Sequence, residues 1–197
     1  METTDTKQKI LDAAVDLISE KGYHNVAVRE ICERAGVTKP VLYYYFKDKE
    51  DVLAELIREG NRRFHDLIDK NIKPDDSFET QLEGLFHVYI RYAEENFSHI
   101  AIAINVELSP LPEKIKSLSR EKTLEVTERI LPVFTRGRDE GIFSDEDDLA
   151  MLAVSFISPL SVFILQCMLH HDPMARMRED LHRYYSFWKS HFLKKKV

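Results

Sequence analysis

A short segment near the amino end carries hydrogen-bonding side chains at a spacing that suits contact with nucleic acid. Thr38 and Lys39 open a short predicted helix, and Tyr43 and Tyr44 follow about one turn later. Their hydroxyl and ammonium groups can donate hydrogen bonds to phosphate oxygens or base edges. Residues 38–49 contain three lysines and one aspartate, so the local charge is +2. The segment therefore offers positive potential together with polar contacts.

Two short predicted helices flank a tight turn in this region. Apolar residues at helical spacing predict the first over residues 28–35, and Gly36 ends it. The hydroxyl of Thr38 is the predicted N-cap of the second, which continues to Phe46. This is the size and turn chemistry of a helix-turn-helix, whose second helix lies in the major groove. Tyr45 and Phe46 are expected to pack inside.

Arg29, on the first of these helices, has two candidate partners. Its guanidinium can contact a DNA phosphate, or it can form an ion pair with Glu33, which lies one helical turn later. The sequence leaves both alternatives open.

The composition predicts an all-α chain of about nine helices. The 197 residues are 44% hydrophobic and include only 6 Gly and 7 Pro, too few for the many turns of an all-β fold. Pro132 is a candidate kink, and Ser144 with Asp147 is a candidate helix cap. Besides the two short helices, the predicted helices cover residues 5–21, 48–70, 78–93, 100–106, 113–140, 145–170 and 173–192.

Charge and cysteine content narrow the class of protein. The net charge is −6, yet residues 1–49 hold 8 Lys or Arg against 8 Asp or Glu, so the acidic excess lies in the rest of the chain. Cys32 and Cys167 fit neither a disulfide framework nor a zinc site. The amino end shows no apolar leader. We therefore predict a cytoplasmic protein with no metal and no cofactor.

One stretch of the sequence resembles a known family. Residues 10–53 contain Gly22-Tyr23, Gly36-Val37-Thr38-Lys39, Leu42-Tyr43-Tyr44-Tyr45-Phe46 and Lys49-Glu50. This pattern closely resembles the amino-terminal DNA-binding domain of the TetR (tetracycline-repressor-like) family of bacterial transcription regulators. The resemblance implies a helix-turn-helix domain over residues 1–48 and a helical ligand-binding and dimerisation domain over residues 49–197.

The resemblance also implies which residues contact operator DNA, and it shows two departures. Ala27 stands where the family usually has a Ser or Thr that caps the helix and touches phosphate, so that contact is lost. Pro40 replaces the common Gly, which narrows the backbone options at the groove. The implied DNA contacts come from Thr38, Lys39, Pro40, Tyr43 and Tyr44, with a phosphate contact from Lys49.

A dimer is expected, because two helix-turn-helix units related by a two-fold axis can contact half-sites about 34–36 Å apart. The resemblance implies a four-helix interface formed by the last two helices of each subunit. Residues 149–169 carry no charge, so a membrane span is an alternative, but interrupting polar residues and the lack of flanking basic clusters favour a buried helix. Candidates for the interface, or for the core beneath it, are Phe156, Leu160, Phe163, Ile164, Leu181, Tyr184, Tyr185 and Trp188.

A small-molecule pocket among the middle helices is a further implication of the resemblance. The default mechanism is a repressor released from its operator when a mainly apolar ligand tilts the long helix over residues 48–70. Asn105 and Gln166 interrupt apolar runs, and each is either a satisfied core residue or a ligand contact. The candidate ligand-binding residues are Phe86, Tyr89, Asn105, Phe134, Gln166 and His170.

Two other function classes compete with this interpretation. The first is a DNA-binding regulator controlled by a protein partner, whose middle domain would be filled by side chains. The second is a helical metal-dependent enzyme, suggested by His170-His171-Asp172 and the acidic run 145–148. Adjacent histidines do not share a helix face, and no phosphate-binding loop or nucleophile elbow is present in the sequence, so we predict a protein that is not an enzyme.

Overall fold

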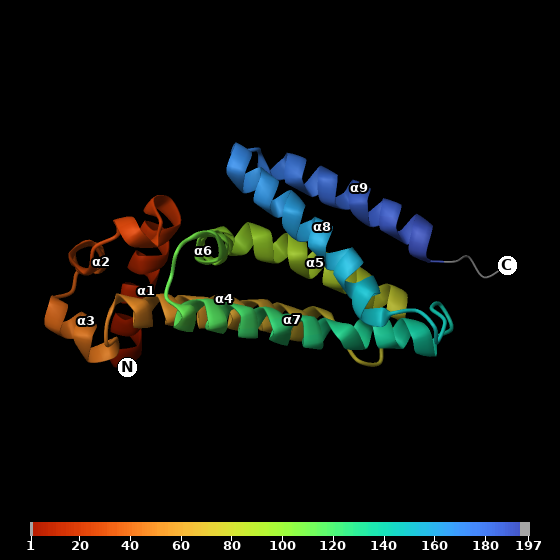
Figure 1. The fold of residues 1–197 in the computed structure, drawn as a ribbon, viewed down its shortest axis with the longest axis horizontal. Coiled ribbons are helices and arrows are strands. Elements are labelled where there is room, and N and C mark those ends of the chain that lie inside the picture. The colour runs from red at the N-terminus through yellow and green to blue at the C-terminus, as the bar shows by residue number, and fades with distance from the viewer. Residues whose placement is uncertain (1, 194–197) are drawn as a thin grey trace. The chain divides into compact units, whose positions relative to one another are not determined.

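The computed structural model describes residues 2–193, and over this range the chain forms nine α-helices and one short 3-10 helix, with no strand (Figure 1). The prediction of an all-α fold is confirmed. The helices are α1 (Glu2–Lys21), η1 (Tyr23–Asn25), α2 (Val28–Ala35), α3 (Lys39–Tyr45), α4 (Lys49–Asn71), α5 (Phe78–Glu95), α6 (Phe97–Leu108), α7 (Glu113–Asp139), α8 (Leu149–His170) and α9 (Met174–Phe192).

The helices pack into two compact units that do not divide at residue 48. Unit 1 contains the chain up to Arg62 together with Asn96–Thr123, and unit 2 contains Arg63–Glu95 together with the chain from Leu124 onward. The packing extends past the predicted boundary because α4 continues the core of unit 1 and α6 packs on α1. The division of roles between residues 1–48 and 49–197 stays a prediction.

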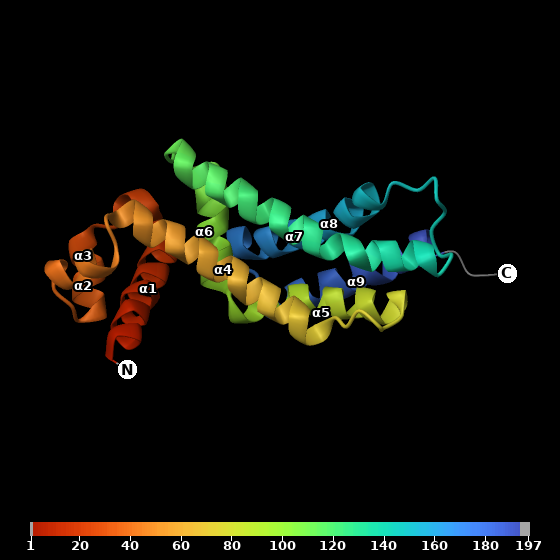
Figure 2. The same cartoon turned by 90° about the horizontal axis from the view of Figure 1, so that it is seen from below.

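Unit 1 has a core shared by its amino-terminal helices and α6. Ile10, Ala14 and Ile18 of α1 are completely buried, and they form one cluster with Leu42 of α3 and Leu53 of α4. Ile102 and Val106 of α6 belong to the same cluster. The helix begins at Phe97 and ends at Leu108, so it is longer at both ends than the predicted 100–106. Figures 1 and 2 show α2 and α3 side by side next to α1. Apolar burial thus holds α3 in place.

Left-handed glycines and an aspartate cap define the ends of these helices. Gly22 and Gly36 have φ angles of 77° and 66°, a conformation that side chains disfavour. The Asp48 carboxylate accepts a hydrogen bond from the Asp51 backbone N–H at 2.8 Å and caps α4, as predicted. At Ala27, where no side chain can cap α2, the Glu30 carboxylate accepts from the Ala27 N–H at 2.8 Å. This hydrogen bond is one of the two that form a capping box, the one that the N3 carboxylate accepts.

Unit 2 is built around an aromatic cluster. Phe78, Phe134, Phe156 and Trp188 are each less than 2% exposed and come from α5, α7, α8 and α9. Their ring centroids lie 5.1–6.2 Å apart in edge-on pairs, the geometry that aromatic rings prefer. Both ribbon views show α8 and α9 as an adjacent pair (Figures 1 and 2). The cluster joins four helices that are distant in sequence.

The start of α8 differs from the prediction. Asp147 accepts a hydrogen bond from the Ser144 N–H at 2.7 Å, but this pair closes a turn before the helix. The helix begins at Leu149, where the Asp148 carboxylate accepts from the Met151 N–H at 3.0 Å. The predicted start at residue 145 was wrong because the Asp147 carboxylate is used in the turn with Ser144, and Asp148 supplies the N-cap instead.

Candidate nucleic-acid interface and pockets

The helix α3 presents a polar face to solvent. Leu42 is completely buried and Phe46, which follows α3, is 2% exposed, so these two residues anchor the helix in unit 1. Tyr43 and Tyr44 on the opposite side are 50% and 78% exposed. Thr38, Lys39 and Pro40 are exposed in the first turn. The structure therefore brings the five residues predicted to contact DNA onto one short solvent-facing helix and its N-cap.

Thr38 occupies the N-cap position but does not use its hydroxyl there. The side chain makes no capping hydrogen bond, while its carbonyl accepts from the Leu42 N–H at 3.1 Å as the first turn forms. The exposed hydroxyl is therefore available to a phosphate or a base edge. Pro40 lies in the first turn and has no N–H, so the backbone offers one donor fewer at this end of the helix.

Arg29 forms the ion pair that the sequence left as one of two alternatives. Its Nε lies 2.6 Å from Glu33 Oε1, one turn along α2, and both side chains are exposed. The hydrogen bond to Glu33 raises the pKa of Arg29. A phosphate contact from Arg29 stays a prediction, because this exposed pair is weak and DNA can compete for the guanidinium.

Lys49 turns toward the protein. Its Nζ donates hydrogen bonds to the main-chain carbonyls of Tyr23 and Val26, each at 2.8 Å. Burial lowers the pKa of this ammonium. The implied phosphate contact stays a prediction, and the side chain already has two acceptors within unit 1.

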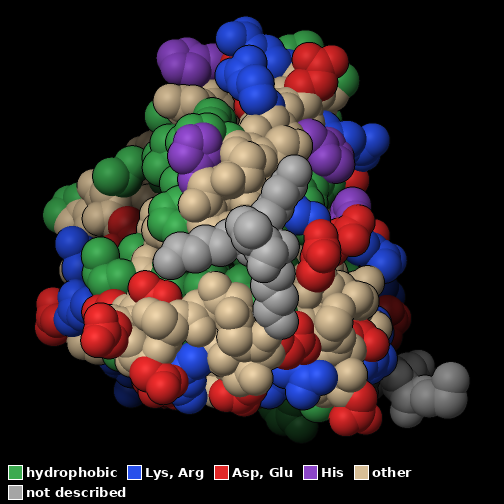
Figure 3. Space-filling model, turned by 90° about the vertical axis from the view of Figure 1, so that its right-hand side faces the viewer, with side chains coloured by type: hydrophobic (Ala, Val, Ile, Leu, Met, Phe, Trp, Pro, Cys, Tyr) green, Lys and Arg blue, Asp and Glu red, His purple; other side chains and the backbone are tan. Residues whose placement is uncertain are grey.

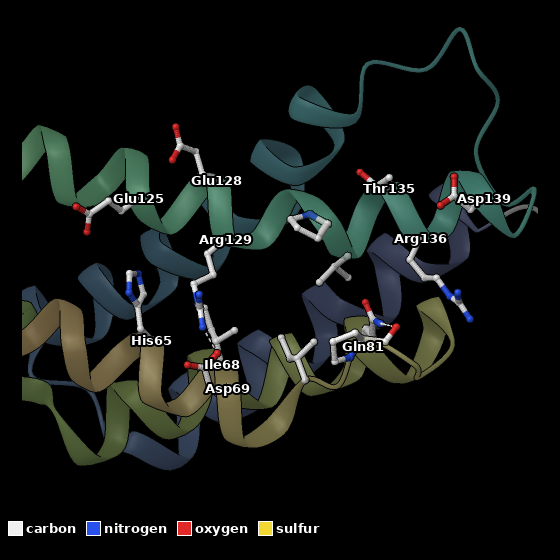
Figure 4. A pocket seen from close by; sticks show the side chains of 14 residues that line it. His65, Ile68, Asp69, Gln81, Glu125, Glu128, Arg129, Thr135, Arg136 and Asp139 are labelled. Carbon is white, nitrogen blue, oxygen red and sulfur yellow. Dashed lines mark hydrogen bonds and ion pairs between the residues drawn. The ribbon is translucent and has the colours of Figure 1, made fainter.

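Unit 2 contains a groove between the carboxyl-terminal halves of α4 and α7 (Figure 4). Its volume is about 870 Å³, and buried Ile68 and Val133 contribute to its apolar lining. Arg129 of α7 pairs with Asp69 of α4, and Figure 4 shows this ion pair between the two helices. The lining includes four carboxylates and two guanidinium groups, a formal charge of −2 before His65 is counted. The lining therefore combines apolar side chains with charged groups of both signs.

The predicted ligand-binding residues do not line this groove. Phe86 and Phe134 are almost completely buried in unit 2, where Phe86 stacks on Tyr185 at 4.3 Å. Tyr89 is also buried, and this burial raises its pKa. The structure does not bring the six candidates together, because apolar helix faces close against each other as readily as around a ligand.

The remaining three candidates lie elsewhere. Asn105 is on α6 in unit 1, where its amide donates to the Ala101 carbonyl at 2.9 Å. Gln166 and His170 line a smaller polar cavity of about 220 Å³ at the α8–α9 turn. The residues that line the larger groove look like an ordinary charged helix surface, and no sequence signal marks them.

Most of the candidate interface residues belong to the core of the chain itself. Phe163, Tyr184 and Tyr185 are half-buried. Burial within one chain leaves the other five no surface to offer a partner, so for them the structure supports the alternative of a core beneath the interface. These five are Phe156, Leu160, Ile164, Leu181 and Trp188.

Other apolar residues on α8 and α9 face solvent. The hydropathy and length of α8 match a membrane span, and only 28% of its most apolar window is buried within one chain. The chain's own core therefore does not bury α8 on nearly all sides, and the predicted burial against a partner subunit stays a prediction. Figure 3 shows hydrophobic and histidine side chains interspersed with Lys, Arg and acidic side chains on the upper part of one face, and charged side chains of both signs on the lower part. Sequence reasoning missed the exposed set, which comprises Met151, Val154, Val162, Leu169, Phe187 and Phe192.

The fold and the exposed face of α3 define the class of protein: a helix-turn-helix DNA-binding regulator. Comparison with known proteins identifies the family. Residues 10–56 match the model of the bacterial regulatory proteins of the tetR family. The chain is 31% identical over 140 residues to the fatty acid metabolism regulator protein of Bacillus subtilis strain 168. The aligned residues cover 70% of this chain and 69% of that protein.

Other relatives agree. The IcaR negative transcriptional regulator of the biofilm operon icaADBC from Staphylococcus epidermidis is 26% identical over 162 residues, which is 80% of each chain. The fatty acid degradation regulator FadR of Bacillus halodurans has a similar fold, with a TM-score of 0.79 at 24% identity over 91% of this chain and 94% of that chain. The structure of FadR of Bacillus subtilis in complex with stearoyl-CoA has a TM-score of 0.77 at 22% identity, over 89% of this chain and 95% of that chain.

This chain belongs to the TetR family of bacterial transcriptional regulators. Regulators of this family bind operator DNA, act as dimers and respond to small-molecule effectors. Membership of this family confirms the prediction of a ligand-responsive DNA-binding repressor. The relatives are regulators of transcription, which agrees with the prediction of a protein that is not an enzyme.

Proposed function

We propose that this regulator is a cytoplasmic homodimer that represses transcription by placing α3 of each copy in the major groove of an operator, and that an acyl-chain-bearing molecule releases it. The observation that carries the DNA-binding part is the polar, exposed face of α3 above a buried Leu42. Thr38, Lys39 and Tyr44 supply hydroxyl and ammonium donors there. These groups suit phosphate oxygens and base edges.

Selection of bound fragments from genomic DNA tests the DNA-binding part, because the operator is unknown. The selected fragments should share an inverted repeat whose half-sites are about one helical turn, 34–36 Å, or a multiple of it apart. Affinity for the recovered fragment should fall steeply as salt rises. If the protein enriches no sequence and binds no duplex even in dilute salt, this part is wrong.

The dimer is supported by the solvent-facing side chains of α8 and α9. Met151 and Leu169 are both 63% exposed, and Val162 is 48% exposed. Apolar side chains gathered on adjacent helices favour contact with another protein surface. A second copy is the occupant that a two-fold operator requires. Light scattering in solution should give twice the chain mass of 23.1 kDa.

The acyl class of effector is supported by two relatives, of which one regulates fatty acid metabolism and one was solved with stearoyl-CoA. The α4–α7 groove is a candidate site because it combines volume with an apolar lining. Ligand binding there would bias the position of α4, the helix that continues into unit 1.

Fluorescence anisotropy of the labelled operator tests the effector class. Acyl-CoA thioesters of short to long chains should weaken binding progressively with chain length, while free CoA should not, because the acyl chain supplies the apolar contact. A fatty alcohol and a fatty amine of the same length separate the chain from the head group. If operator affinity is unchanged by every acyl compound, the acyl class is wrong, and the DNA-binding proposal still stands on the selection experiment.

A further inference from the structure

Lys49 is the first residue of α4, and its side chain forms hydrogen bonds with the turn that contains Tyr23 and Val26. Nζ donates to the carbonyls of Tyr23 and Val26, each at 2.8 Å, and lies 4.1 Å from the centroid of the Tyr23 ring. Tyr23 and Val26 are both buried. The contacts therefore connect the start of α4 to η1 and its C-cap, in front of α2.

The chemistry of these contacts is specific for an ammonium. The Tyr23 carbonyl also accepts the Val26 N–H at 3.4 Å, and its second lone pair remains for the ammonium. An ammonium has three donors, and two are used by Tyr23 and Val26. The Tyr23 ring adds a cation–π contact on the same charge. One donor at most is left for DNA.

The connection matters because it holds the helix-turn-helix on a second side. α3 ends at Tyr45 and α4 begins at Lys49, so only residues 46–48 join them along the chain. Phe46 in that link is buried and fixes the end of α3. The Lys49 contacts hold the other end of the motif along the chain, at the turn that precedes α2. Together these contacts restrict how α2 and α3 can tilt against α4. Both contacts lie within the protein.

We propose that Lys49 is a positioning residue for operator recognition: it locks the start of α4 to the turn before α2 and so sets the angle at which α3 is presented. It does not serve as a phosphate contact. This inference rests on the proposed DNA-binding function. Wild-type protein that binds no duplex would refute that function, whereas the variants below test Lys49 itself.

The salt dependence of operator binding separates the two roles. A lysine that neutralises one phosphate contributes about 0.9 to the slope of log affinity against log salt. Lys49→Met keeps the length of the side chain and removes its hydrogen bonds. We expect roughly tenfold weaker binding, about 1.4 kcal/mol, at every salt concentration, with the slope unchanged. Each dimer carries two copies of Lys39, so Lys39→Met on exposed α3 should instead lower the slope by about 1.8.

Two further variants make the result decisive. Lys70→Met removes one positive charge from the exposed last turn of the same helix and should change neither affinity nor slope. Lys49→Gln, which keeps an amide donor without the charge, should recover part of the lost affinity. All measurements are made at a temperature at which circular dichroism shows each variant fully folded.

The inference is overturned by either of two results. If Lys49→Met lowers the salt slope by about 1.8, that is by about 0.9 for each copy in the dimer, Lys49 contacts a phosphate after all. If the folded variant binds the operator as tightly as wild type and only its melting temperature falls, the contacts stabilise unit 1 without positioning α3. Uniform weakening with an unchanged slope, partly recovered by Lys49→Gln, supports the proposal.

Discussion

Removing a single hydroxyl from Tyr44 separates DNA contact from stability. Tyr44 is 78% exposed, and its ring meets Tyr45 edge-on at a centroid distance of 5.0 Å. Tyr44→Phe keeps this ring pair and deletes only the oxygen. A hydrogen bond to a charged group is worth about 1.5–3 kcal/mol. The dimer presents one Tyr44 to each half-site, so the variant removes two such hydrogen bonds, about 3–6 kcal/mol in total. If the hydroxyl donates to a phosphate, operator affinity should therefore fall between about 150-fold and about 25,000-fold.

The free energy of unfolding should change by less than about 0.5 kcal/mol, as is usual for exposed sites. Anisotropy titration of the operator and thermal unfolding of the same sample measure both quantities. Tyr44→Ala is the matched comparison, because it also removes the ring pair with Tyr45 and about 0.5–1.5 kcal/mol of stability with it. Equal operator affinity for wild type and Tyr44→Phe would refute the assignment of this hydroxyl to DNA.

Three other predictions test the packing. Gly137→Ala should lower the melting temperature, because the added Cβ would lie 2.6 Å from the Phe143 ring and 2.9 Å from Phe78; overpacking of about 1–3 kcal/mol outweighs the gain of about 1 kcal/mol in helix propensity. Burial raises the pKa of Tyr184 to about 12, so this residue's contribution to stability is complete below the unfolded pKa of about 10 and is lost as pH rises toward 12. Tyr184→Phe should therefore show a shallower alkaline decline in melting temperature, and an unchanged decline would contradict this. Val162→Glu should give monomers by light scattering, because it places a charge on the proposed apolar interface. An unaltered dimer would show that this part of α8 does not lie in the interface.

Much of the fold follows from local sequence rules. Apolar periodicity, the left-handed glycines Gly22 and Gly36 and the Asp48 cap act within one or two helical turns, so the sequence alone locates α1 to α4 closely. The exposed face of α3 follows as well, because Leu42 and Phe46 repeat at helical spacing on its buried side. Where several caps compete, as before α8, local rules fail and packing decides.

Features that depend on contacts between distant segments were outside the reach of sequence reasoning. Phe134 and Trp188 look equally suited to a ligand wall, an interface or a core, and only the arrangement of four helices assigns them to the core. The groove beside Asp69 and Arg129 exists because α4 and α7 lie next to each other.

The sequence by itself determined the helical class of this protein and the helix-turn-helix with its polar recognition face. Those properties arise from side-chain periodicity, capping and turn geometry, which act over a few residues. The tertiary structure alone decided that Lys49 bonds to the carbonyls of Tyr23 and Val26, and which apolar residues of α8 stay exposed. Burial and long-range hydrogen bonds depend on which helices meet, and no local pattern records that.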